Sequence, residues 1–349
     1  MKEVRFASDD LEVVVLPEVG ARLHRLRAFG HELLLTPADP EAHRREPFFW
    51  GGFVMAPWCN RIEAGRVEVG GRTIELGSNF GDGSAIHGQV YDRPWANRPD
   101  GSFVVSGGGH GWPWTYEAGL RVEVAGHVVR IEQSLRNTAA DPMPAGLGIH
   151  PWFRRPLEVA IRGGEVYSPN TGTPARPVPA AGALDLRRLG EMPSGLDATW
   201  AGLADPPVEL RWPDLGVRAV LRAIGPTVYI VAASPGHLGA IAIEPQTHVP
   251  QGLRRLRNGE PGALAWLDPG RELRLVTELA FSREASGEGR GQHDAGRRRT
   301  RPGRMSDTVR SSSRGGAIAA LRPGGSTQWP RSRCPSSARA WPRGRSASG

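Results

Sequence analysis

Short runs of alternating apolar and polar residues, separated by glycine and proline, constrain the fold of this chain more than any other feature. Residues 115–124 and 127–135 alternate in this way on either side of Gly126, which predicts an antiparallel hairpin. Similar runs lie at 11–16, 22–27, 32–35, 208–212, 217–221, 228–232 and 271–281. No long amphipathic helix stands out between them. Many short strands with Gly and Pro turns predict an all-β sandwich or barrel.

The even spacing of these runs favours one large β domain over residues 1–282. Beyond it the composition changes, since Leu, Ile, Val and Phe are represented from 283 to 349 only by Val309, Ile318 and Leu321. Such a segment buries too little apolar area to offset the entropy lost on ordering. We therefore predict a disordered tail, rich in Arg, Gly, Pro and Ser, over residues 283–349.

The positive charge of the chain is concentrated in that tail. Residues 283–349 contain 15 arginines and four acidic residues, whereas the rest of the chain has 29 basic and 32 acidic residues. A mildly acidic body argues against specific binding of nucleic acid. The tail alone can be interpreted as a polyanion-binding segment or as an extension without function. The second interpretation is favoured because no aromatic ladder accompanies the charge.

The ends of the chain and its cysteines indicate where the protein works. Cys59 and Cys334 are the only cysteines, which gives neither a disulfide framework nor a metal-binding pair. The first residues lack the apolar stretch of a signal peptide, and no apolar run reaches the length of a membrane helix. We expect a cytoplasmic protein without a membrane partner, as a monomer or a weak homodimer.

One candidate catalytic group is the carboxylate at the end of the run 240–244. In a strand, side chains alternate between faces, so Ala242 and Glu244 share one face. Pro245 follows at once, which disfavours a helix and holds Glu244 in an extended conformation. The expected result is an acid displayed at a strand end, beside a small residue that leaves room for a ligand.

A second segment, 146–153, repeats this logic with a histidine. Gly146, Gly148 and His150 would share one face, and Pro151 follows the histidine. Glycine inside a strand often marks the close approach of a ligand or of another backbone. An acid and a histidine, each above a cleared surface, predict proton transfer on a bound small molecule.

Further polar residues interrupt the body at three places. Asn60 and Arg61 stand among bulky groups, His87 precedes a glycine, and Asp197 lies in a turn-rich stretch. Taken singly, His87 fits a hydrogen-bonded structural residue, Asp197 a turn or cap residue, and Arg61 a surface ion pair. The interpretation changes only when these residues are considered as a set.

Five short motifs, in their order along the chain, resemble the pattern of the aldose 1-epimerase (galactose mutarotase) family: Asn60-Arg61-Ile62, Ile86-His87-Gly88, His150-Pro151-Trp152-Phe153, Leu196-Asp197 and Glu244-Pro245-Gln246-Thr247. The resemblance extends from about residue 11 to residue 281 and leaves the tail uncovered. It implies a large antiparallel β-supersandwich with an open sugar cleft. It also implies an isomerase of carbohydrate metabolism whose partner is a small-molecule sugar.

The resemblance implies a role for each matching residue. Glu244 matches the general base that takes the proton of the anomeric hydroxyl, and His150 the general acid that protonates the ring oxygen. His87 matches a histidine that assists near the ring oxygen or binds the sugar. Arg61 and Asp197 match groups that bind sugar hydroxyls, and we place Asn60 and Trp152 with them. The family often has Tyr at the position of Trp152, which leaves the sugar preference open.

The chemistry of ring opening fits these residue types without a cofactor. One proton must be removed and another delivered within one site, with no redox or covalent step. A carboxylate with a pKa near 4.3 can accept, and a histidine with a pKa near 6.5 can be kept protonated by a neighbouring carboxylate. We therefore expect a bell-shaped pH profile, with the acidic limb from Glu244 and the basic limb from a histidine.

Three other functions compete with this one. A metal centre could use His87, His150, Glu244 and His248, although no His-x-His or His-x-x-x-His spacing supports it. A non-catalytic sugar-binding sandwich would have no need for both Glu244 and His150. An epimerase of hexose 6-phosphates would need a cationic pocket, for which Arg154 and Arg155 are the candidates. The sequence leaves open whether the hexose is free or phosphorylated.

Overall fold

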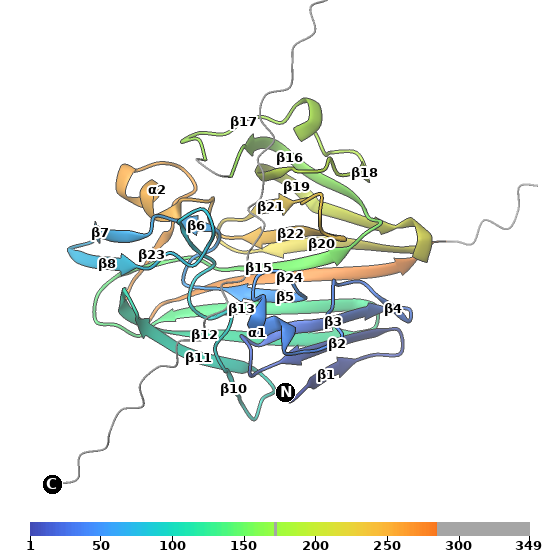
Figure 1. Cartoon of the computed structure of the whole chain (residues 1–349), viewed down its shortest axis with the longest axis horizontal. Coiled ribbons are helices and arrows are strands. Elements are labelled where there is room, and N and C mark those ends of the chain that lie inside the picture. The colour runs from blue at the N-terminus through green and yellow to red at the C-terminus, as the bar shows by residue number, and fades with distance from the viewer. Residues whose placement is uncertain (171–172, 285–349) are drawn as a thin grey trace, which may run out of the picture.

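The computed structural model describes residues 1–170 and 173–284. Eighteen of its strands form one large sheet, and long antiparallel strands run side by side across the molecule (Figure 1). The predicted all-β supersandwich is confirmed. The strands of the large sheet are β1 (Val4–Ala7), β2 (Leu11–Leu16), β3 (Arg22–Ala28), β4 (His31–Glu32), β5 (Gly52–Met55), β10 (Ala96–Asn97), β11 (Phe103–Gly109), β12 (Trp112–Ala125), β13 (Val128–Asn137), β15 (Gly148–Arg154), β16 (Glu158–Tyr167), β17 (Val178–Pro179), β18 (Gly190–Glu191), β19 (Asp197–Trp212), β20 (Val217–Ile224), β21 (Tyr229–Ala233), β22 (Ala240–Gln246) and β24 (Glu272–Arg283).

Two short helices and three two-stranded ladders lie outside this sheet. Two short α-helices are present in the described residues, α1 (Ala42–Arg45) and α2 (Gly252–Asn258). Three two-stranded ladders pair β6 (Arg61–Ile62) with β9 (Ala85–Ile86), β7 (Gly65–Val69) with β8 (Arg72–Leu76), and β14 (Met143–Ala145) with β23 (Ala265–Leu267).

Most of the expected strands form, and the predicted hairpin is confirmed. β12 and β13 pair in register from Tyr116↔Asn137 to Ala125↔Val128, and the turn between them holds Gly126 at φ 53°. The strand expected at 32–35 is wrong, because β4 ends at Glu32. The reason is a change of partner: Leu33 N–H donates to Leu26 on β3, whereas Leu35 N–H donates to Trp152 on β15.

The two segments that carry Glu244 and His150 also extend further than expected. β22 continues through Pro245 and β15 through Pro151, so both side chains lie inside strands and not at strand ends. The ladder between the two strands is broken instead. Pairing stops at Gly148↔Gln246 and resumes at Trp152↔Ala242. A proline has no N–H to donate, so the two strands lose their pairing with each other over this stretch. On their outer sides β15 remains paired to β5 and β22 to β21.

The alternation of side chains separates the core from the site at these strands. Leu147, Ile149, Ile241 and Ile243 belong to the main hydrophobic cluster. Residues between them in sequence, His150 and Glu244 among them, therefore face the opposite side of the sheet. Burying the apolar face fixes the register, because a slip by one residue would turn the polar side chains into the core.

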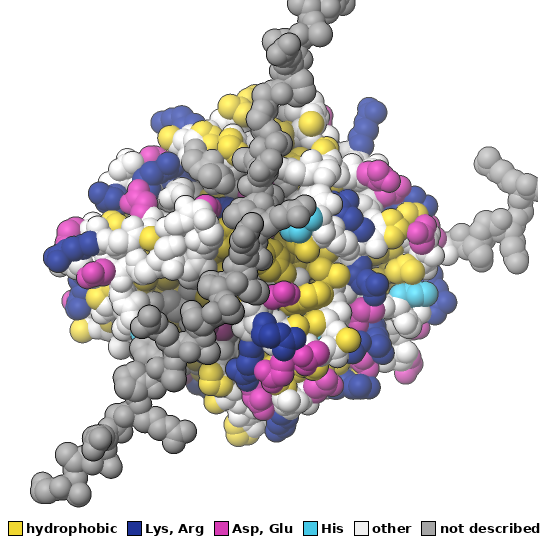
Figure 2. All heavy atoms as spheres, viewed as in Figure 1, with side chains coloured by type: hydrophobic (Ala, Val, Ile, Leu, Met, Phe, Trp, Pro, Cys, Tyr) yellow, Lys and Arg dark blue, Asp and Glu magenta, His cyan; other side chains and the backbone are white. Residues whose placement is uncertain are grey.

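The surface of the described residues carries charges of both signs. Figure 2 shows acidic and basic side chains interspersed over this face, with hydrophobic side chains gathered near its middle. Among the described residues, no helix has the length and hydropathy needed to cross a bilayer. The tail predicted from residue 283 lies outside the described residues beyond Glu284. Arg283 ends β24, and Glu284 forms ion pairs with Arg211 and Arg218.

Candidate active site

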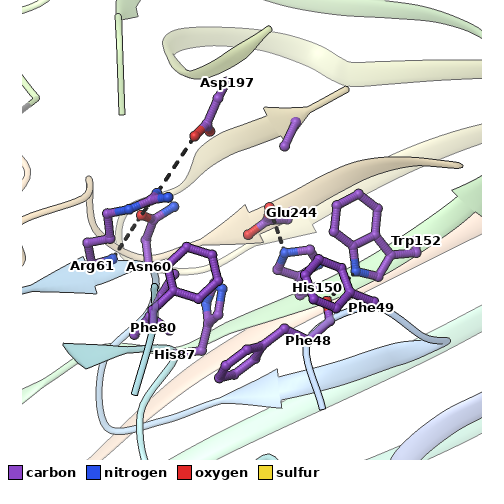
Figure 3. Close-up of a pocket in the computed structure, with 12 residues that line it drawn as sticks. Phe48, Phe49, Asn60, Arg61, Phe80, His87, His150, Trp152, Asp197 and Glu244 are labelled. Atoms are coloured by element: carbon purple, nitrogen blue, oxygen red, sulfur yellow. Dashed lines mark hydrogen bonds and ion pairs between the residues drawn. The ribbon is translucent and has the colours of Figure 1, made fainter. Parts of the chain in front are cut away.

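One pocket brings together all seven residues singled out in the sequence (Figure 3). They come from separate parts of the chain, since β15, β19 and β22 supply four of them and the segments around β6 and β9 supply the rest. The residues that line the pocket are Phe48, Phe49, Asn60, Arg61, Phe80, Ile86, His87, His150, Trp152, Asp197, Ala233 and Glu244.

Glu244 and His150 form the centre of the pocket. Glu244 Oε1 lies 3.2 Å from His150 Nε2, and the side chains are only 2% and 6% exposed. The second carboxylate oxygen, Oε2, accepts a 2.7 Å hydrogen bond from Gln246 Nε2. Both oxygens of the carboxylate therefore have a partner, which fixes its orientation. The two residues lie opposite each other where the pairing of β15 with β22 is interrupted.

Burial has opposite effects on the two partners. It raises the pKa of Glu244 well above its usual value, and the charge of Asp197 adds to this shift. It lowers the pKa of His150 to about 3, and the charge of Arg22 contributes to the lowering. Both shifts disfavour charge. Burial therefore favours the uncharged form of the pair over the ion pair.

His87 lies at the edge of β9, with its ring centroid 5.1 Å from that of His150. Its Nδ1 is 2.8 Å from Met55 Sδ. A thioether can only accept, so the imidazole N–H donates there and Nε2 is left as an acceptor. Burial lowers the pKa of His87 well below its usual value, with the nearby His150 and Arg61 adding to the effect. His87 is thus a neutral acceptor.

Arg61 is held by carboxylates on two sides. Its Nε donates to Asp82 Oδ2 at 2.6 Å, and its Nη1 lies 3.7 Å from Asp197 Oδ2. Asn170 in turn donates to Asp197 Oδ1 at 2.6 Å. Figure 3 shows Arg61, Asn60 and Asp197 on the side of the pocket away from Trp152. The arrangement presents a fixed guanidinium with two carboxylates nearby, which suits the binding of hydroxyl groups.

The sequence and the fold together identify the family. Residues 2–178, which are half of the chain, match the sequence pattern of the family described as aldose 1-epimerase. The chain belongs to the aldose 1-epimerase family. No curated protein matches its sequence.

Solved structures of the same fold are found among proteins of related description. The GalM/aldose epimerase homologue from C. elegans is 16% identical with a TM-score of 0.71, covering 81% of this chain and 99% of that chain. A galactose mutarotase-like protein from Clostridium acetobutylicum is 18% identical with a TM-score of 0.69, covering 81% and 98%. Galactose 1-epimerase from Lactobacillus acidophilus is 18% identical with a TM-score of 0.65, covering 81% and 95%. At these identities the likeness shows the fold.

An aromatic wall of the pocket was not anticipated from the sequence. Phe48 and Phe49 line the pocket from the loop before β5, and Trp152 Nε1 donates to the carbonyl of Phe48 at 2.6 Å. Behind them, the ring of Phe53 stacks on His150 with centroids 4.6 Å apart. The run of aromatic residues that begins at Phe48 was the available signal, but such runs more often form core.

A buried arginine, Arg22, contacts the residues that flank this wall. Arg22 is fully buried, and its guanidinium carbon lies 4.9 Å from the centroid of the Phe53 ring. It donates to the carbonyls of Pro47, Trp50 and Tyr91, at 2.6, 3.0 and 3.3 Å. Burial lowers its pKa to about 9. Three carbonyls thus hold a cation that fixes both ends of the loop carrying Phe48 and Phe49.

The two glycines near His150 serve a different purpose from the one predicted. A Cβ at Gly146 would lie 2.3 Å from the ring of His248, and one at Gly148 would lie 2.7 Å from Cys59 Sγ. The space that they leave is therefore filled by protein side chains and not kept for a ligand. The expectation of a cleared surface beneath the sugar is wrong at these positions.

The metal centre considered from the sequence is not formed by these residues. Across residues 1–170 and 173–284, no three His, Cys, Asp or Glu side chains are arranged to hold a metal ion. Both ring nitrogens of His248 are already hydrogen-bonded, Nε2 to Cys59 N–H and Nδ1 to the carbonyl of Val249.

The sequence analysis missed Asp82, which no local motif marked. Its carboxylate accepts a hydrogen bond from Arg61 and so helps to hold that side chain in the pocket.

Proposed function

We propose that this protein is an aldose 1-epimerase that interconverts the α and β anomers of a hexose. The observation that carries the proposal is the 3.2 Å contact between Glu244 and His150 inside a pocket lined with hydroxyl-binding groups. A general acid and a general base within reach of one sugar ring are what ring opening requires. Membership of the aldose 1-epimerase family supports this activity.

The pair carries out the reaction with one proton. Transfer of the proton from Glu244 to His150 across their contact gives a carboxylate and an imidazolium. The carboxylate takes the proton of the C1 hydroxyl while the imidazolium gives its proton to the ring oxygen, and the bond between C1 and the ring oxygen breaks. Rotation about C1–C2 turns the aldehyde over. The reverse proton transfers then close the ring to the other anomer, and the pair returns to its starting state.

The other residues of the pocket bind and orient the sugar. Arg61 is held in place by Asp82 and Asp197 and donates to hydroxyl groups, while Asp197 accepts from them. His87 offers Nε2 as an acceptor beside the reacting centre. The aromatic wall around Trp152 packs against the apolar face of the ring. A mostly apolar pocket with a few fixed polar groups is typical of small-molecule sites.

The charges of the pocket favour a free hexose over a hexose 6-phosphate. Arg61 is the only Lys or Arg side chain among the described residues that line it, and it is already paired with carboxylates. Asp197, which also lines the pocket, would repel a phosphate when ionised. Arg154 and Arg155, the candidates for phosphate binding, do not line the pocket.

Polarimetry of freshly dissolved sugars tests the proposal. We expect the full-length protein to accelerate the mutarotation of α-glucose or α-galactose more than that of α-glucose 6-phosphate. Acceleration of the phosphate alone would assign the protein to phosphorylated sugars. Sugar binding without any acceleration would make it a sugar-binding protein and would contradict the proposed activity.

A further inference from the structure

His248 is a buried histidine for which the reaction has no use. Its side chain is fully buried four residues after Glu244, just beyond the end of β22. Cys59 N–H donates to its Nε2 at 2.8 Å, and its Nδ1 lies 2.8 Å from the carbonyl of Val249. A backbone amide can only donate and a carbonyl can only accept. The ring is therefore the tautomer with hydrogen on Nδ1, and the lone pair of Nε2 accepts the hydrogen bond from Cys59.

The surroundings of the ring maintain this state. Burial lowers the pKa of His248 to about 4, so the ring stays neutral and keeps its acceptor around neutral pH. Two glycines leave room for it. A Cβ at Gly146 would lie 2.6 Å from Nε2, and a Cβ at Gly252 would lie 2.6 Å from Nδ1. The position of the ring is thus fixed from both sides.

The hydrogen bond from Cys59 holds the segment that carries the sugar-binding residues. Asn60 and Arg61 follow Cys59 directly, and both line the pocket. Asn60 has a positive φ of 51°, which asparagine tolerates, and its Oδ1 accepts the N–H of Arg61 at 2.8 Å, so the turn is tightly folded. The carbonyl of Asn60 also accepts the N–H of His87 at 3.1 Å. Displacement of Cys59 would therefore move three residues of the pocket together.

We propose that His248 is a positioning residue for sugar binding, which fixes the Cys59–Arg61 turn relative to the strand that carries Glu244. This inference rests on the proposed function, because it assigns the turn to the sugar. The carboxylate of Glu244 is held separately, by Gln246 and His150. Loss of the His248 contact should therefore weaken binding more than it slows the chemical step.

Three variants of the full-length protein test the proposal. His248→Phe keeps the ring and removes the acceptor, whereas His248→Gln keeps an acceptor near the position of Nε2. Gly146→Ala keeps the histidine in the sequence but adds a methyl group that would clash with its ring. Leu221→Ala, which truncates a buried side chain on β20 remote from the pocket lining, is the control for a general loss of stability.

The readout is KM and kcat for mutarotation of the sugar that the wild type accepts, together with Tm. We expect KM to rise by about tenfold in His248→Phe, the effect of one lost buried hydrogen bond, with kcat changed less. His248→Gln should recover most of the loss, and Gly146→Ala should raise KM. Leu221→Ala should lower Tm and leave KM unchanged.

Other results would overturn the inference. An unchanged KM in folded His248→Phe would show that the turn holds its position without the histidine. If that variant does not fold, an unchanged KM in Gly146→Ala would have the same meaning. A wild type that accelerates no sugar would contradict the proposed function instead, and equilibrium binding of galactose to the same variants would then test the positioning role by itself.

Discussion

Glu244 and His150 face each other at 3.2 Å from two neighbouring strands that are not hydrogen-bonded to each other at that point. Each residue is followed by a proline, so the break in the ladder and the catalytic candidates have a common origin in the sequence. The relationship supports a division of labour in which the strands fix the two side chains and the surrounding loops bind the sugar.

Replacement of Glu244 by glutamine should remove the base without changing its shape. We expect kcat for mutarotation to fall by about 10²–10⁴-fold, the usual contribution of a positioned acid or base. Circular dichroism should show an intact fold. Glu209→Gln is the matched control, since Glu209 pairs with Arg162 on the surface and should leave turnover unchanged. Near wild-type kcat in folded Glu244→Gln would reject the assignment.

The two pocket histidines should differ in their kinetic effects. His150→Asn removes the proton donor and should lower kcat by at least about 10²-fold. His87→Asn removes an acceptor held in place by Met55, and should raise KM more than it lowers kcat. Steady-state polarimetry of both variants separates the two roles. The reverse order of effects would mean that the histidines have exchanged functions.

The pH profile should be bell-shaped, with its limbs assigned in the opposite way to that expected from the sequence. Burial raises the pKa of Glu244 and lowers that of His150 to about 3. Below the lower value the pair holds two protons and has no base, and above the higher value it holds none and has no acid. The acidic limb therefore belongs to His150 and the basic limb to Glu244, as properties of the coupled pair. A Glu244→Gln variant with residual activity should lose the basic limb, and retention of that limb would contradict the assignment.

Asp82 should matter for binding although it does not line the pocket. It holds Arg61 through a 2.6 Å hydrogen bond, and its side chain is 28% exposed. We expect Asp82→Ala to raise KM by about three- to tenfold, because a charge-assisted hydrogen bond to a binding residue is lost. Asp39→Ala is the control, since it breaks the exposed pair with Arg45. Equal KM values for the two variants would show that Arg61 needs no support from Asp82.

The protein should lose stability as the pH is lowered from 7 to 5. Burial lowers the folded-state pKa to about 2 for His43, about 3 for His150 and about 4 for His248. Below about 6.5 the unfolded chain takes up protons that the folded chain refuses, so each histidine lowers the free energy of unfolding by about 1.4 kcal/mol per pH unit.

Glu244 has the opposite effect over part of this range. Its raised pKa means that the folded state keeps a proton which the unfolded state loses, so its contribution to stability falls as pH rises. Asp92 and Asp197, whose pKa values are also raised, act like Glu244. The histidines with lowered pKa values, which also include His24 and His87, outnumber these three carboxyl groups. Urea unfolding at pH 5 and pH 7 measures the net change, and His43→Phe should show a smaller loss on acidification. A stability that is constant or higher at pH 5 would contradict the expected shifts.

The sequence predicted the site residues that lie on strands better than those that lie on loops. Alternation of side chains suffices to place Glu244 and His150 on the face away from Ile243 and Ile149, because period-two patterns survive folding. The aromatic wall at Phe48 could not be derived in this way. Its position depends on carbonyl contacts to Arg22, which lies in another strand and carries no local signal.

Gly148 in β15 and Gly146 just before it show a second limit of prediction from the sequence. A missing side chain indicates that something comes close, but it does not say whether a ligand or the protein itself fills the space. Here His248 and Cys59 do so. Similarly, a proline after a strand-like run predicted an end to the strand, whereas in the structure both strands continue and only the pairing between β15 and β22 is lost.

The two prolines in the break between β15 and β22 also determine what holds these strands in place. Pro151 and Pro245 have no N–H to donate, so the ladder between the two strands cannot be completed at this point. Over the same stretch β15 stays paired to β5 and β22 stays paired to β21. The rigidity of the Glu244–His150 pair therefore comes from the outer neighbours of its two strands and not from the strands' bonds to each other.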